Sequence, residues 1–224
     1  MAGKLIVLDG TDASGKQTQA AAIEKILKER GENVLKVTFP NYEEAYAAPV
    51  RMYLAGEFGD KPGDVNPYAA SIFYAVDRIC SFKNKWQAFY EAGGIIIADR
   101  YTTSNAIHQG SKLEEDRREA FFAWLYDFEF DKIGLPKPDC VLFLDMPPSV
   151  SQKLMANRLN KATGQKEKDI HEKDTRYLEM CYRAANCAAK FYGWEKIACT
   201  DAAGEVRKAE DITVEVMQTI DKYL

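Results

Sequence analysis

A glycine-rich loop near the N-terminus carries the clearest chemical signal in the sequence. Residues 10–18, GTDASGKQT, contain the spacing GxxxxGK between an apolar run and a helix-like stretch. Glycines leave backbone N–H groups open to phosphate oxygens, Lys16 can reach the β and γ phosphates, and the helix N-terminus adds partial positive charge. The alternative is a turn that merely connects strand to helix. Because strand, loop, lysine and helix all fall where phosphate binding needs them, we predict a nucleotide-binding loop.

One position of this loop departs from the usual pattern. Gln17 follows the lysine where such loops normally carry Ser or Thr, and Thr18 comes one residue later. The usual hydroxyl contacts Mg²⁺. We therefore expect Gln17 to be at most a weak metal ligand through its amide oxygen, with water as the alternative.

A second reactive pair, Asp99 and Arg100, directly follows the apolar run GIIIA. In open α/β sheets ligands bind beyond the carboxyl ends of the strands, so this pair should face the same crevice as the phosphate loop. The Asp99 carboxylate can hold Mg²⁺ through water, and the Arg100 guanidinium offers a planar fork to phosphate. Alone, the pair could equally be a surface salt bridge.

The elements that must position these residues alternate along the chain. Short and mostly continuous apolar runs are typical of strands buried on both faces, and they occur at 4–9, 33–39, 94–100, 140–145 and 194–200. Helical patterns separate or follow them at 15–30, 67–92, 171–192 and 207–222. This order predicts a three-layer α/β/α sandwich with a five-stranded parallel sheet. We expect one domain, 1–224, with a polar, mobile lid at about 158–169.

Composition sets the limits of the function. The 224 residues are 46% hydrophobic and 29% charged, with a net charge of -4, which excludes a disordered chain and disfavours a nucleic-acid coat. No apolar run approaches the roughly 20 residues of a membrane span. The five cysteines form no CxxC pair and are expected to be reduced thiols. We expect a cytoplasmic protein that binds neither nucleic acid nor membrane.

Several segments, taken together and in this order, resemble the thymidylate kinase family, whose fold is that of the P-loop nucleotide kinases. The likeness covers nearly the whole length and is carried by GTDASGK (10–16), FPN (39–41), SIFYAVDR (71–78), DRYTTSNAIHQG (99–110), LFLDMPP (142–148) and DIHEKDTRYL (169–178). The resemblance implies transfer of the ATP γ-phosphoryl group to dTMP, with Mg²⁺ as cofactor, ATP as co-substrate and a homodimer as the assembly.

The resemblance also implies roles for individual residues. ATP would lie along Gly10, Thr11, Asp12, Ala13, Ser14, Gly15, Lys16, Gln17 and Thr18. The acceptor dTMP would contact Asp12, Phe39, Pro40, Arg51, Tyr74, Arg78, Arg100, Ser104, Asn105 and His108. In this interpretation Tyr74 stacks on the base, although Phe73 could take its place, and Arg78 and Asn105 read the base edge. The metal would lie near Asp99, with Gln17 as a second, weaker ligand.

The catalytic set implied by the resemblance includes one residue of the lid. Family members place a catalytic arginine either after the loop's acidic residue or in the lid, and Ala13 occupies the first position here. Arg158 is therefore the best candidate, ahead of Lys161, Lys166 and Lys168. The resulting catalytic residues are Lys16, Asp99, Arg100, Arg158 and Asp12.

Other functions remain open from the sequence alone. A P-loop kinase acting on another nucleotide, such as dUMP or dCMP, or on a nucleoside would share most of these features. A nucleotide-binding regulatory protein without turnover is a further alternative, and Gln17 is its main support. Guanine-selective switches usually carry an NKxD motif, which this sequence lacks.

Overall fold

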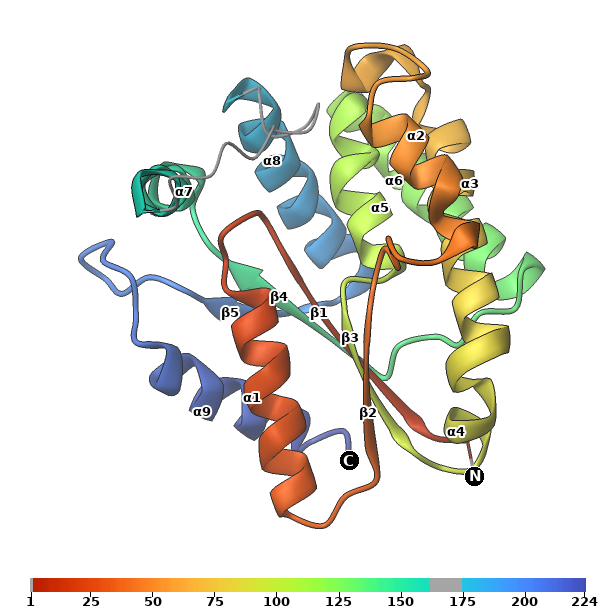
Figure 1. Ribbon diagram of the computed structural model, residues 1–224. Coiled ribbons are helices and arrows are strands. Elements are labelled where there is room, and N and C mark those ends of the chain that lie inside the picture. The colour runs from red at the N-terminus through yellow and green to blue at the C-terminus, as the bar shows by residue number, and fades with distance from the viewer. Residues whose placement is uncertain (1, 162–174) are drawn as a thin grey trace.

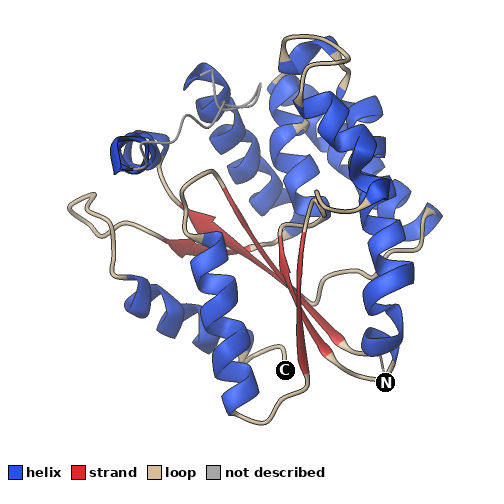
Figure 2. Cartoon of the chain, in the orientation of Figure 1, coloured by secondary structure: helices blue, strands red, loops and turns tan. Residues whose placement is uncertain are grey.

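Five parallel strands form the centre of the computed structural model, which describes residues 2–161 and 175–224 (Figures 1 and 2). The strand order is β2-β3-β1-β4-β5. The strands are β1 (Lys4–Gly10), β2 (Val34–Thr38), β3 (Ile95–Asp99), β4 (Cys140–Asp145) and β5 (Glu195–Ala198). All five lie within the predicted apolar runs or extend them by a single residue, and the predicted three-layer parallel sheet is confirmed.

Helices cover both faces of the sheet. They are α1 (Lys16–Glu29), α2 (Ala48–Leu54), α3 (Pro67–Ser81), α4 (Gln87–Glu91), α5 (Thr102–His108), α6 (Glu115–Tyr126), α7 (Pro148–Lys161), α8 (Thr175–Tyr192) and α9 (Ala209–Ile220). In Figure 1, α1 and α9 lie on one face, whereas α3, α4, α5, α6 and α8 lie on the other. The β1–β2 connection therefore uses one face and the returning connections use the opposite face. The β1–β2 connection also runs across the sheet in the opposite direction to the later connections. Because both the direction and the covered face are reversed, all of these crossovers keep the usual right-handed sense.

Two layers of apolar side chains hold the helices to the sheet. Successive strand residues point to opposite faces, so Ile6 and Leu8 of β1 pack with α1 and α9. Leu5 and Val7 face the other layer, where they pack with Phe82. All five residues of β3 are buried, which explains its uninterrupted Ile-rich sequence.

The register of the strands determines where the functional segments meet. β1 and β3 pair with Leu8 opposite Asp99, and β2 and β3 pair with Thr38 opposite Asp99. On the other side of β1, Gly10 lies opposite Leu144 of β4. The chain therefore leaves β1, β2 and β3 at one edge of the sheet. The phosphate loop, residues 39–41 and the segment after Asp99 begin there together.

The predicted helix at 67–92 is wrong in one respect, because it is not a continuous α-helix. A π-helical turn, Phe82–Trp86, separates α3 from α4. The wider turn allows both Phe82 and Trp86 to enter the core, with their ring centroids 4.6 Å apart and Trp86 fully buried. Aromatic packing therefore overrides regular helical geometry at this position.

The predicted lid at 158–169 falls mostly outside the described residues. Residues 158–161 form the end of α7, while 162–174 and the Arg158 side chain lie outside what the structure describes. None of the helices in the described parts of the chain is long and apolar enough to cross a bilayer. All five cysteines have free thiols.

Candidate active site

The phosphate loop joins β1 to α1 and has the backbone conformation that its glycines allow. Gly15 adopts a left-handed conformation with φ of 87°, directly before the first turn of α1. A Cβ at Gly10 would approach the Leu144 carbonyl oxygen to 2.7 Å, so the loop can pass β4 only with glycine there. This conformation leaves the start of α1 facing the edge of the sheet where phosphate would bind.

Lys16 places its ammonium group inside the loop. Nζ donates to the carbonyl oxygens of Gly10 at 2.9 Å and Thr11 at 2.8 Å, and the residue is only 7% exposed. Burial, aided by the positive charge of Arg100, lowers the pKa of Lys16 to about 8, although Asp12, Asp9 and Asp99 act in the opposite direction. An anionic ligand would favour the charged form of this lysine.

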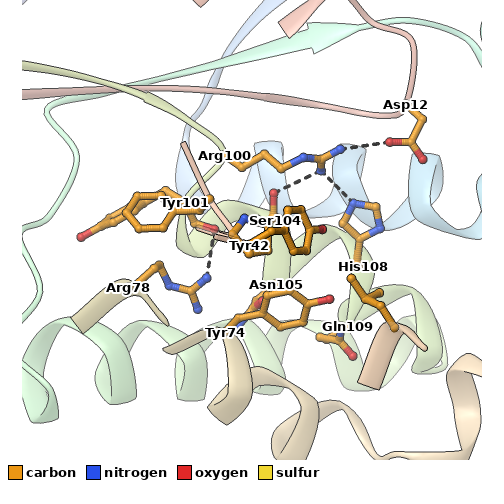
Figure 3. A pocket seen from close by; sticks show the side chains of 13 residues that line it. Asp12, Tyr42, Tyr74, Arg78, Arg100, Tyr101, Ser104, Asn105, His108 and Gln109 are labelled. Carbon is orange, nitrogen blue, oxygen red and sulfur yellow. Dashed lines mark hydrogen bonds and ion pairs between the residues drawn. The ribbon is translucent and has the colours of Figure 1, made fainter. Parts of the chain in front are cut away.

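Arg100 lies at the centre of a polar network beyond β3 (Figure 3). Nη2 donates to Asp12 Oδ1 at 3.0 Å, and Nη1 lies 3.1 Å from His108 Nε2 and 3.4 Å from Ser104 Oγ. Because a guanidinium can only donate, His108 Nε2 accepts and its proton is on Nδ1. The backbone of Arg100 is left-handed, with φ of 67°, a strained conformation for a residue other than glycine.

The two acidic residues of the first β-α junction have different environments. Burial would raise the pKa of Asp12, but the nearby charges of Arg100 and Lys16 outweigh it and hold this pKa at about 2. Asp9 is fully buried and accepts hydrogen bonds from Thr103 Oγ1 at 2.5 Å and Ser104 Oγ at 2.7 Å. Asp9 thus fixes the start of α5 beneath the phosphate loop.

A cavity of about 210 Å³ extends from this network across the edge of the sheet. It is lined by Asp12, Phe39, Pro40, Tyr42, Leu54, Tyr74, Arg78, Arg100, Tyr101, Ser104, Asn105, His108 and Gln109. Asp12, Arg100 and His108 lie together at one end, whereas Tyr74 and Arg78 lie away from Asp12 (Figure 3). The cavity therefore combines an anion-binding end with an aromatic, amide-containing end.

Arg78 of α3 contributes a charge at the second end of the cavity. Its guanidinium is paired with Glu129, through Nε at 3.1 Å and through Nη2, and Nη1 lies 3.4 Å from the Tyr101 carbonyl oxygen. Burial raises the pKa of Glu129, while Arg78 acts against this shift. Both side chains lie almost wholly inside the protein.

The structure brings most of the predicted acceptor residues together. Nine of the ten line the cavity: Asp12, Phe39, Pro40, Tyr74, Arg78, Arg100, Ser104, Asn105 and His108. Phe73, the alternative to Tyr74, contacts Phe58 instead, with ring centroids 5.4 Å apart. The Phe39–Pro40 peptide bond is cis.

Three of the predicted site residues that do not line this cavity contact the backbone of another loop or are exposed to solvent. Arg51 does not line it, and Nη1 of Arg51 donates to the backbone oxygens of Tyr42 at 2.6 Å and Glu44 at 2.8 Å. Gln17 and Thr18 are exposed on the first turn of α1. The predicted contacts of these three residues with phosphate or metal therefore remain predictions, as does the role of Arg158.

Sequence reasoning missed six residues at or behind the site. Four of them line the cavity, namely Tyr42, Leu54, Tyr101 and Gln109, and two support it from behind, namely Asp9 and Glu129. Neither amide atom of the fully buried Gln109 has a hydrogen-bond partner among the residues that the structure describes. The acidic end of the first apolar run could have indicated Asp9, but no motif marks Glu129.

With this geometry in place, comparisons with known proteins identify the family. The family model for thymidylate kinase matches residues 8–191. The chain belongs to the thymidylate kinase family. Thymidylate kinase of Mycobacterium tuberculosis (strain CDC 1551 / Oshkosh) is 30% identical over 191 residues, which cover 85% of this chain and 87% of that protein.

Other relatives extend the likeness over the whole chain. Thymidylate kinase of Caldicellulosiruptor saccharolyticus is 28% identical over 225 residues, covering 100% of this chain and 98% of the relative. Among solved structures, thymidylate kinase of Candida albicans aligns with a TM-score of 0.68 at 19% identity, over 99% of this chain and 92% of that one. At this identity the structural match supports the fold.

Proposed function

We propose that this protein transfers the γ-phosphoryl group of ATP to dTMP, giving dTDP and ADP. The observation that carries the proposal is the two-ended cavity. One end holds Tyr74, Arg78 and Asn105, which suit a base, and the other holds Arg100 and Asp12 beside the phosphate loop. A single nucleotide can place its base in one end and its phosphate at the other, next to the donor loop.

The proposed reaction depends on alignment and charge neutralisation. Phosphoryl transfer passes through a loose transition state, so the protein contributes little covalent chemistry. Lys16 neutralises charge on the donor phosphates, and Arg100 holds the acceptor phosphate for in-line attack on the γ-phosphorus. Asp12 orients Arg100 through their 3.0 Å contact. Arg51, on the sequence-based interpretation, adds a second positive charge near the acceptor phosphate.

The residues at the edge of the sheet fit a magnesium ion bound mainly through phosphate and water. Mg²⁺ in such sites uses one or two carboxylates together with substrate phosphates. Burial raises the pKa of Asp99, and its carboxylate accepts no hydrogen bond from any residue in the described ranges. No cluster of three or more acidic, His or Cys ligands occurs within those ranges. Asp99 would hold the ion, with Gln17 the weaker candidate, and the bound ion would neutralise phosphate charge.

The base end of the cavity favours a pyrimidine that has a carbonyl group. An aromatic face such as Tyr74 binds any base, so polar groups must provide the choice. Arg78 can only donate hydrogen bonds, which matches a carbonyl oxygen. A thymine methyl group is worth only about 1–3 kcal/mol, so dUMP is the nearest competing acceptor.

We further propose a homodimer in the cytoplasm. Tyr68, Ile72 and Val76 are large, partly exposed apolar residues spaced by four along α3, so they form one stripe on the helix. A second copy of the chain would cover this stripe. Analytical sedimentation of the unsubstituted protein and of Ile72→Glu tests this interface. The unsubstituted protein should sediment as a dimer and the variant as a monomer, and an equal mass for both would refute the interface.

The free thiols support a reducing compartment, as the cytoplasm is.

The lid at 158–169 is proposed from the sequence to supply the catalytic arginine. Arg158→Ala should lower turnover at least about tenfold, which corresponds to about 1.4 kcal/mol. Lys153→Ala, an exposed position earlier on α7, is the matched control. A smaller loss at Arg158, or an equal loss in the control, would refute this role.

A coupled assay that monitors ADP release tests the function. It contains ATP, Mg²⁺ and one nucleoside monophosphate at a time from a panel. We expect ADP formation to depend on dTMP, to continue with dUMP at lower efficiency and to be negligible with AMP. Lys16→Met should abolish it. Lys28→Met is the control, because Lys28 lies at the far end of the same helix and pairs with Glu24 at 2.7 Å. ATP binding without measurable ADP formation in the presence of any acceptor would instead favour a regulatory nucleotide-binding protein without turnover.

A further inference from the structure

Glu129 is a buried carboxylate without a role in the mechanism described above. It lies in a π-helical turn, Asp127–Lys132, that follows α6, and its side chain is 0% exposed. Its partner Arg78 lies 51 residues earlier in the chain and is equally enclosed. An ion pair at this depth loses hydration and is weak evidence for stability. Its position behind the base end of the cavity suggests a different reason for its presence.

The hydrogen bonds of Arg78 determine what the cavity can offer to a ligand. A guanidinium has five N–H donors. Glu129 takes one from Nε and one from Nη2, and the Tyr101 carbonyl oxygen takes one from Nη1. The two remaining donors are on Nη1 and Nη2. Glu129 binds the edge of the guanidinium formed by Nε and Nη2. The edge formed by Nη1 and Nη2 is therefore left to donate to a ligand acceptor.

Asn105 is oriented by the same carboxylate. Its Nδ2 lies 3.3 Å from the Ser71 carbonyl oxygen and 3.5 Å from Glu129 Oε1. Both neighbours are acceptors, so the amide nitrogen must face them. Oδ1 of Asn105 is therefore the atom left to accept a hydrogen bond in the cavity. If the amide were reversed, Oδ1 of Asn105 would instead face the Ser71 carbonyl oxygen and Glu129 Oε1, and no donor would lie between these oxygens.

We propose that Glu129 is a positioning residue that selects carbonyl-bearing pyrimidines over aminopyrimidines by fixing both Arg78 and Asn105. The proposal rests on the proposed function, because it concerns the acceptor base of that reaction. The cavity then presents a donor from Arg78 next to an acceptor from Asn105. Thymine and uracil present the complement, a carbonyl acceptor next to an N–H donor. Cytosine presents the reverse at both positions, with an amino group facing Arg78 and a ring nitrogen facing Oδ1.

The experiment compares kcat/KM for dTMP and dCMP in Glu129→Gln, which keeps the shape and removes the charge. We expect the dTMP value to fall at least about tenfold and the dCMP value to change less than about threefold, with the KM for ATP unchanged. Asp131→Asn is the matched control, because Asp131 lies in the same turn, is exposed and pairs with Lys137. That variant should keep the unsubstituted ratio of dTMP to dCMP.

A double-mutant cycle separates positioning from general damage. In an Arg78→Met background, Glu129→Gln should change the dTMP to dCMP ratio less than about threefold, because only the 3.5 Å contact between Glu129 and Asn105 remains. An equal additional fall would contradict the proposal. If Glu129→Gln does not yield folded protein, Glu129→Asp replaces it, because this variant keeps the charge but moves the carboxylate away from Arg78. An unchanged ratio of kcat/KM for dTMP to that for dCMP in Glu129→Asp would overturn the proposal. If the unsubstituted protein does not phosphorylate dTMP, the proposed function itself fails, whereas a retained ratio in a variant refutes only the role of Glu129.

Discussion

The buried ammonium of Lys16 should make ATP binding depend on pH in the alkaline range. Its pKa is lowered to about 8, first by burial and then by Arg100. In the protein without ATP, Lys16 is then about nine tenths charged at pH 7 and about one tenth charged at pH 9. The phosphates of ATP favour the charged form, so binding above pH 8 requires proton uptake. The KM for ATP should therefore rise about tenfold between pH 7 and pH 9 and stay level below pH 7.

Lys16→Arg provides the matched control for this prediction. Arginine stays charged throughout this range, so the variant should bind ATP with little pH dependence even if its affinity is lower. Titration calorimetry at pH 9 in buffers of different ionisation enthalpy measures the proton uptake directly. We expect close to one proton per ATP for the unsubstituted protein and close to none for the variant. Absence of proton uptake, or equal uptake in both proteins, would refute the assignment.

Three further substitutions test other parts of the account. Arg100→Lys keeps the charge but cannot reach Asp12, Ser104 and His108 at once, so kcat/KM for dTMP should fall at least about tenfold; a change under twofold would contradict the central position of Arg100. Gln109→Met removes two buried amide atoms without partners among the described residues and should raise the free energy of unfolding by about 1 kcal/mol, measured by urea denaturation; a loss would show that these atoms are satisfied. Trp86→Ala empties the centre of the aromatic layer and should cost about 3–5 kcal/mol in the same assay, whereas a cost under about 1 kcal/mol would contradict its packing role.

The strands and the phosphate loop could be predicted because their signals are local. Continuous apolar runs marked every strand of the sheet, and the GxxxxGK spacing placed Lys16 at the start of α1. The apolar run also placed Asp99 at the end of β3. Because ligands bind at the carboxyl ends of parallel strands, the sequence could then predict that Asp99 lies at the same edge of the sheet as the phosphate loop.

The rest of the site depends on contacts between distant segments. Glu129 reaches Arg78 across 51 residues, and the π-helical turn that holds it has no sequence signature. Arg51 has the positive charge expected of a phosphate-binding residue, but its Nη1 donates a hydrogen bond to the backbone oxygen of Tyr42. The choice between Phe73 and Tyr74 depended on which face of α3 meets the cavity, which packing against Phe58 decides.

The most direct test of the central claim follows the phosphoryl group itself. ATP labelled with ¹⁸O at the γ-phosphate is incubated with dTMP and Mg²⁺, and the products are analysed by mass spectrometry. The account predicts that dTDP carries the intact labelled phosphoryl group in an amount equal to the ADP formed. Labelled inorganic phosphate without labelled dTDP, or no turnover at all, would contradict it.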